Sequence, residues 1–145
     1  MRISKIIIAK RIITLIQVLI LIPPVLLQYL SDRKMGVMRY LVFKKDMFSK
    51  EIFTSSSTFI YIILLFLGAI CCIIFLLYSY IRKKNVVLIK PIFVLFLLNV
   101  ICLYYAFSFK FKMILSYHFF LIAFFIIIIL QFIKIIIIAS DNKFA

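Results

Sequence analysis

Four long apolar stretches constrain the fold of this 145-residue chain more than any other feature of its sequence. They run over residues 12–30, 58–81, 86–107 and 113–139. A helix needs about 20 apolar residues to cross the roughly 30 Å hydrocarbon layer of a bilayer. Inside lipid every backbone amide must be paired within its own segment, so such stretches must be α-helical. The sequence predicts an all-α integral membrane protein, a single domain (residues 1–145) formed by a bundle of four transmembrane helices.

The composition agrees with a membrane protein, because polar residues are too few to cover a globule in water. Hydrophobic residues make up 68% of the chain, whereas a soluble domain is about half apolar. The absence of Trp and the presence of only 2 Gly indicate a genome poor in G and C. A bacterial cytoplasmic membrane and an organellar inner membrane therefore both stay open as locations.

The formal charge of +14 arises from 18 Lys and Arg against 4 Asp and Glu. These basic residues lie in short flanks beside the apolar stretches, where anionic lipid headgroups attract them. Nucleic-acid binding would need a contiguous basic face. The partners that we expect are therefore other membrane-protein subunits and lipids with anionic headgroups at the basic flanks, and no nucleic acid.

The distribution of positive charge between the loops predicts the orientation, because basic residues near span ends favour the cytoplasmic side. The face with both termini carries ten: Arg2, Lys5, Lys10, Arg11, Arg82, Lys83, Lys84, Lys90, Lys134 and Lys143. The opposite face carries eight: Arg33, Lys34, Arg39, Lys44, Lys45, Lys50, Lys110 and Lys112. The difference favours both termini on the cytoplasmic or matrix side.

The first loop, residues 31–57, mixes apolar and basic side chains and is the only substantial polar segment. We expect it to be interfacial, lying against the headgroups or capping the bundle. A surface that docks a partner or covers a ligand is the alternative. Residues 54–58, with the sequence TSSST, are predicted to cap the second transmembrane helix.

Three amides lie inside the apolar stretches and are candidates for polar contacts between helices: Gln17, Asn99 and Gln131. Gln17 and Gln131 enter the membrane from the same side to a similar depth. A hydrogen bond between them is therefore predicted, and such bonds contribute about 0.6 to 2 kcal/mol in membranes. Asn99 lies near the middle of its stretch, so its side chain is expected to point into the bundle or at a neighbouring subunit.

A second group of residues is expected to anchor the helices at the membrane interface. Long basic side chains can extend to the headgroups, and tyrosine rings favour the same level. The candidates are Lys134, Lys90, Tyr29, Tyr78, Tyr80, Tyr104, Tyr105 and Tyr117. His118 lies beside the last of these tyrosines, and its role stays open.

The residues that enzymes and ion-coupled transporters require are missing from the apolar stretches. The four carboxylates, Asp32, Asp46, Glu51 and Asp141, all lie outside them, whereas coupled transport normally uses ionisable groups within the membrane. No Ser/His/Asp set, Gly-rich phosphate loop or Cys-x-x-Cys pair is present. The chain is therefore predicted to be no enzyme, with no catalytic, cofactor-binding or metal site.

Three functions remain compatible with these features. The first is a non-catalytic accessory or structural subunit of a larger membrane complex of the respiratory, ATP-synthase, transport or secretion type. The alternative is a small homo-oligomeric transporter, pore or lipid-handling protein, in which Gln17, Asn99, Gln131 and Lys134 would line a polar track. The third is a membrane immunity or regulatory protein.

Overall fold

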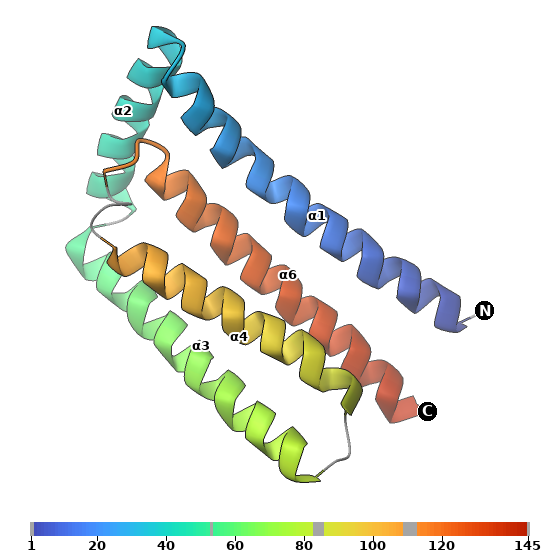
Figure 1. Cartoon of the computed structure of the whole chain (residues 1–145). Coiled ribbons are helices and arrows are strands. Elements are labelled where there is room, and N and C mark those ends of the chain that lie inside the picture. The colour runs from blue at the N-terminus through green and yellow to red at the C-terminus, as the bar shows by residue number, and fades with distance from the viewer. Residues whose placement is uncertain (1, 53, 83–85, 109–112, 145) are drawn as a thin grey trace.

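Long helices account for nearly all of the chain in a computed structural model (Figure 1). The structure describes residues 2–52, 54–82, 86–108 and 113–144, without the side chains of residues 2, 3, 82, 86, 87 and 141–144. Its helices are α1 (Arg2–Ser31), α2 (Met35–Glu51), α3 (Ser55–Arg82), α4 (Val86–Phe107) and α6 (Tyr117–Phe144). Four of them, α1, α3, α4 and α6, are long and apolar enough to cross a membrane. The protein is therefore an all-α membrane protein with four spanning helices.

The side chains of several basic residues that enter the orientation prediction lie outside the described part of the structure. They are those of Arg2, Arg82, Lys83, Lys84, Lys110, Lys112 and Lys143. Both ends of the chain lie at the same end of the bundle, near the start of α1 and the finish of α6 (Figure 1). We call this the termini end.

The helices extend beyond some of the predicted stretches and fall short of one. The first helix begins at Arg2 rather than residue 12, because the basic tail that precedes the apolar stretch continues the same helix. The last helix begins at Tyr117 rather than residue 113. Ser116 directly precedes this helix, and its carbonyl accepts the first intrahelical bond, from the N–H of Phe120 at 3.1 Å. Residues 113–116 form a turn instead.

The first loop folds largely into helix α2, which lies across the ends of α1 and α6 opposite the termini end (Figure 1). Leu41 is fully buried on the side of α2 that packs on the bundle. Two turns further along the same face, the Phe48 ring centroid lies 6.0 Å from that of His118 and 5.6 Å from that of Phe119. Helix α2 therefore caps the bundle.

The TSSST segment begins helix α3 as the sequence predicts. The Thr54 carbonyl accepts a hydrogen bond from the N–H of Thr58 at 2.9 Å. The Thr54 hydroxyl lies 2.9 Å from the hydroxyl of Ser57. Thr54 therefore occupies the N-cap position of α3, where threonine is among the preferred residues.

The spanning helices follow one another in space in the order α1, α6, α4, α3. Two clusters of buried residues join the last three of these helices. One contains Tyr105, Ala106, Tyr117 and Leu121, with Ile62 of α3 packed against it. The other contains Leu88, Ile92 and Ile138, with Leu76 of α3 and Ile135 packed against it. Helix α1 contributes to neither cluster.

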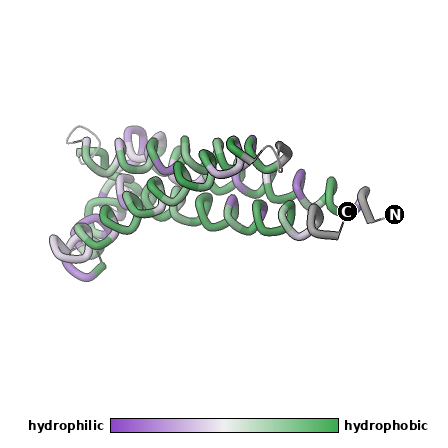
Figure 2. Tube along the Cα trace, turned by 90° about the horizontal axis from the view of Figure 1, so that it is seen from below, coloured by the Kyte–Doolittle hydropathy of each residue, from purple (hydrophilic) through white to green (hydrophobic). Residues whose placement is uncertain are grey.

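The outer faces of the spanning helices are apolar almost throughout. Figure 2 shows hydrophobic residues along most of their length, with the hydrophilic ones gathered mainly at the end opposite the termini. Only 6% of the most apolar part of α1 is buried within the chain, against 39% for α4. Helix α1 is therefore an edge helix that is held on one side.

Candidate functional site

Polar side chains connect helices α1 and α6 at three levels along their length. We call this set of contacts the α1–α6 seam. From the α2 end to the termini end it pairs Gln28 with Ser116, Gln17 with Gln131, and Thr14 with Lys134. Residue numbers rise along α1 as they fall along α6, so the two helices are antiparallel.

The middle level of the seam joins three helices. The side-chain amide of Gln17 donates to the Gln131 Oε1 atom and to the Ile127 carbonyl, both at 3.2 Å. The Gln131 Nε2 group in turn donates to the carbonyl of Pro91 on α4 at 2.9 Å. Gln131 is only 1% exposed. The two glutamines that the sequence predicts as partners are thus brought together, and α4 is joined to them.

The level nearest α2 was not predicted from the sequence. The Gln28 Oε1 atom accepts from the Ser116 hydroxyl at 2.8 Å and from the Ser116 backbone N–H at 3.3 Å. Ser116 is fully buried, so without Gln28 its N–H would lie unpaired at the start of α6. A side chain on α1 therefore holds the N-terminus of α6.

The level nearest the termini involves Lys134, which the sequence assigned to interface anchoring. Its Nζ atom donates to the Thr14 hydroxyl at 2.8 Å, and that hydroxyl donates to the Lys10 carbonyl at 2.9 Å. This contact places Lys134 beside the first turn of the apolar stretch that begins at residue 12. Its ammonium group is therefore bonded to α1 near the start of that stretch.

Asn99 of α4 is not part of the seam, and it lines a cavity with Gly68 of α3 and Phe132 of α6. Its side chain is 3% exposed, and its Nδ2 group donates to the Leu95 carbonyl of its own helix at 3.0 Å. A Cβ atom added to Gly68 of α3 would lie 3.5 Å from the Asn99 Oδ1 atom. Asn99 therefore points into the bundle, as expected, and its Nδ2 hydrogen bond stays within α4.

The predicted interface anchors divide into two groups. Lys90 and four of the tyrosines, Tyr29, Tyr78, Tyr80 and Tyr104, are exposed. Tyr105 and Tyr117 depart from the prediction, because they are 8% and 6% exposed and stack on each other with ring centroids 5.3 Å apart. Consecutive residues of a helix point about 100° apart. When Tyr104 faces outward, Tyr105 must therefore turn towards the core.

His118 is also buried, at 6% exposure, with Phe48 and Tyr117 as its aromatic neighbours. Catalysis or metal binding by a histidine needs further polar groups around it. Within the described part of the chain, no group of three His, Cys, Asp or Glu side chains lies close enough to hold a metal ion. His118 therefore lies beneath α2, between the rings of Phe48 and Tyr117.

An apolar groove runs between α3 and α6 with α4 as its floor. Two adjoining cavities of about 310 and 280 Å³ form it, and they share Gly68, Cys72, Leu95 and Phe132. Cys71 and Phe75 extend the wall on α3. Small side chains on α3 make this groove, so another apolar chain can approach the backbone closely there.

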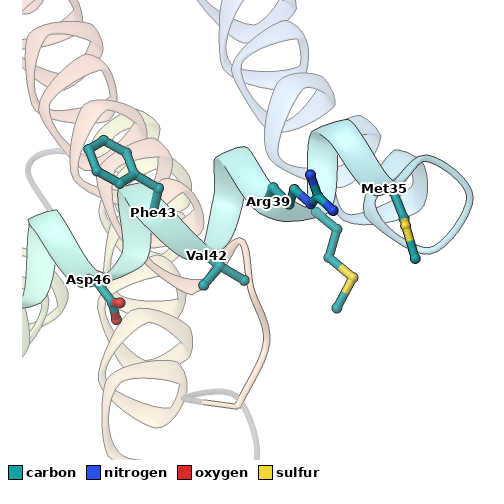
Figure 3. A pocket seen from close by; sticks show the side chains of 6 residues that line it. Met35, Arg39, Val42, Phe43 and Asp46 are labelled. Carbon is teal, nitrogen blue, oxygen red and sulfur yellow. The ribbon is translucent and has the colours of Figure 1, made fainter.

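The outer face of α2 carries a second, shallower depression, of about 470 Å³ (Figure 3). Met35, Met38, Val42 and Phe43 line it, with Arg39 and Asp46 among them. This face is turned away from the side of α2 on which Leu41 is buried. Helix α2 therefore exposes apolar side chains on the face that does not pack on the bundle.

Comparisons with known proteins add no family assignment to this geometry. No family model, no curated protein and no solved structure matches the chain.

Proposed function

We propose that the protein is a non-catalytic accessory or structural subunit of a larger membrane complex. One observation carries the proposal. The Gln and Asn side chains within the spans are bonded inside the chain, whereas large apolar side chains cover its outer faces. A subunit of this kind would pack against other spanning helices and brace them.

The hydrogen bonds of the buried amides support this function over a solute pathway. A pathway for ions or polar solutes needs polar groups that face water inside the membrane. Gln17, Gln131 and Asn99 instead use their amide groups on the Ile127, Pro91 and Leu95 carbonyls and on each other. Asn99 bonds to its own helix, so these contacts do not link it with the two glutamines in one polar track.

The α3–α6 groove is the surface that we expect to receive a helix of the partner. Gly68 and Cys72 are one turn apart on α3 and leave room for a close approach. Small residues at such spacing are typical of helix–helix contacts in membranes. The groove is lined mainly by apolar side chains, with Asn99 among them, so it suits a spanning helix better than a polar ligand.

The experiment compares two phenylalanine substitutions on α3 in the full-length protein. Cys71→Phe adds a ring at the groove, whereas Ile74→Phe makes the control change at an exposed position that lies outside the groove lining. Purification in a mild detergent with mass measurement of the intact complex is expected to give a stoichiometric complex larger than the 17.1 kDa chain. Cys71→Phe should release the partner, and Ile74→Phe should retain it.

Two results would contradict the proposal. One is a stable 17.1 kDa species without partners at native expression level. The other is solute flux through liposomes that contain this chain alone and that Gln131→Met abolishes. The second result would favour the transporter hypothesis instead.

We further propose that both termini lie on the cytoplasmic or matrix side. The excess of basic residues on that face supports this orientation, and the two termini share one end of the bundle (Figure 1). Reporter domains fused to either terminus should therefore be protected from protease added outside. Digestion of both reporters would reverse the orientation.

A further inference from the structure

The termini end of the α1–α6 seam has the composition of a phospholipid site. A depression of about 620 Å³ opens there at the surface, lined by Lys10, Arg11, Thr14, Leu15, Val18 and Lys134. Its lining is basic at one end and apolar at the other. We propose that this depression binds one anionic phospholipid, with the phosphate among the basic side chains and an acyl chain along α1.

Lys134 is the best-placed phosphate ligand of the three cations. An ammonium group has three N–H donors, and the bond to the Thr14 hydroxyl at 2.8 Å uses one of them. Thr14 is itself fixed by its bond to the Lys10 carbonyl. The ammonium group is therefore held in position with donors left for a further acceptor.

The described side chains provide no negative charge to neutralise this cluster. The carboxylates whose side chains are described, Asp32, Asp46 and Glu51, are at the other end of α1 or on α2. Asp141 is not among the described side chains. The lining carries three positive charges from Lys10, Arg11 and Lys134, so an anion is the ligand that it complements.

The depth of the cluster distinguishes a lipid from a free anion. Lys10 and Arg11 directly precede the apolar stretch that begins at residue 12, which is the level of the phosphates of a bilayer. Leu15 and Val18 follow one to two turns deeper and are 63% and 59% exposed. A phosphate followed by hydrocarbon in this order is the arrangement of a phospholipid molecule.

The absence of Trp from the chain allows a direct binding assay. Leu19→Trp places a single fluorophore one turn beyond Leu15, at an exposed position outside the lining. Phosphatidylglycerol with brominated acyl chains, titrated into the protein in neutral detergent micelles, should quench this fluorophore saturably. Brominated phosphatidylcholine should quench it only in proportion to its share of the micelle.

Charge-removing variants in this background locate the phosphate. Arg11→Gln and Lys134→Gln should each weaken phosphatidylglycerol binding about fivefold, which corresponds to the roughly 1 kcal/mol expected for one basic residue near the surface. Lys90→Gln is the matched control, since Lys90 is exposed on α4 near the same end and lies outside the lining. It should change binding less than twofold.

Arg11→Gln leaves the bond between Thr14 and Lys134 intact, so it separates loss of a phosphate ligand from loosening of the seam. Equal weakening by Lys90→Gln and Arg11→Gln would overturn the proposal, because the attraction would then be general. Displacement of the lipid by equimolar glycerol phosphate would also overturn it and would assign the cluster to a soluble anion. The assay uses the isolated chain, so its outcome is independent of the partner subunit.

Discussion

The two outer helix pairs of the bundle are held together in different ways. Helices α1 and α6 are bonded through polar side chains at three levels, and α1 contributes to neither core cluster. Helices α3 and α4 pack through apolar and small residues, with Gly68 against Asn99. The first pair joins the two ends of the sequence, whereas only residues 83–85 separate the second pair.

This difference shows what fixes the register of a helix pair in lipid. A three-residue connection leaves α3 and α4 few ways to align. Helices α1 and α6 have no such restraint, and faces of Ile, Leu and Phe pack nearly as well after a shift along the axis. A shift would break the hydrogen bonds of the Gln17 and Gln131 side-chain amides, and unpaired polar groups are costly in hydrocarbon. The hydrogen bonds therefore select one alignment.

The largest effect is expected from Gln131→Met, which keeps the side-chain length and removes the bonds to Gln17 and Pro91. We expect a loss of about 1–3 kcal/mol in the free energy of unfolding, since the buried bond to Pro91 and the part-buried bond from Gln17 are both lost. Titration with a denaturing detergent measures it. Gln17→Met should cost less, and the double variant should cost less than the sum. Strict additivity would show that the two amides are not coupled.

A smaller effect, about 1 kcal/mol, is expected from Gln28→Met, which leaves the Ser116 N–H and hydroxyl without their acceptor. The loss should be local to the start of α6. Hydrogen exchange is therefore expected to rise over the first turn of α6 and to stay unchanged at Gln131. Leu26→Met, at an exposed position on the same helix, is the control. A uniform rise in hydrogen exchange along α6 in Gln28→Met would contradict the idea that the three levels of the seam are independent.

The smallest effect is expected in the α3–α4 pair, from Gly68→Ala. The added Cβ would lie 3.5 Å from the Asn99 Oδ1 atom, which is an ordinary contact. Replacing helical glycine by alanine gains up to about 1 kcal/mol through helix propensity. We therefore expect an unchanged or slightly higher free energy of unfolding. A loss above about 1 kcal/mol would mean that this pair is as sensitive to side-chain detail as the seam.

The sequence alone was sufficient for the four spans and for one contact of the seam. Hydropathy identifies spans because lipid admits few alternatives to an apolar helix. The Gln17–Gln131 contact followed from depth, since both amides enter from the same side. Gln28 and Ser116 are related by depth in the same way at the other end of the two helices. Their contact is not among the predictions, because the predicted last span begins at residue 113 and includes Ser116, whereas in the structure Ser116 directly precedes α6.

Other features depended on the rotation of the helices about their axes, which depth does not determine. Tyr105 and Tyr117 have the sequence position of interface anchors but face each other in the core. The sequence does not mark Thr14 as a contact residue, because a threonine in a helix has no distinctive pattern. Its role depends on Lys134, whose Nζ atom donates to the Thr14 hydroxyl. Similarly, Asn99 lies beside Gly68 of α3, a neighbour that its depth alone could not indicate.

The seam connects residues that are synthesised far apart in time. Gln17 and Gln131 are 114 positions apart, and ribosomes add about 5–20 residues per second. Helix α1 therefore exists for roughly 6–23 s before its counterpart has been made. During that interval the glutamine side chains of α1 can bond to another helix or to a chaperone in the membrane. Dissociation of that transient contact is then a step in the biogenesis of the protein.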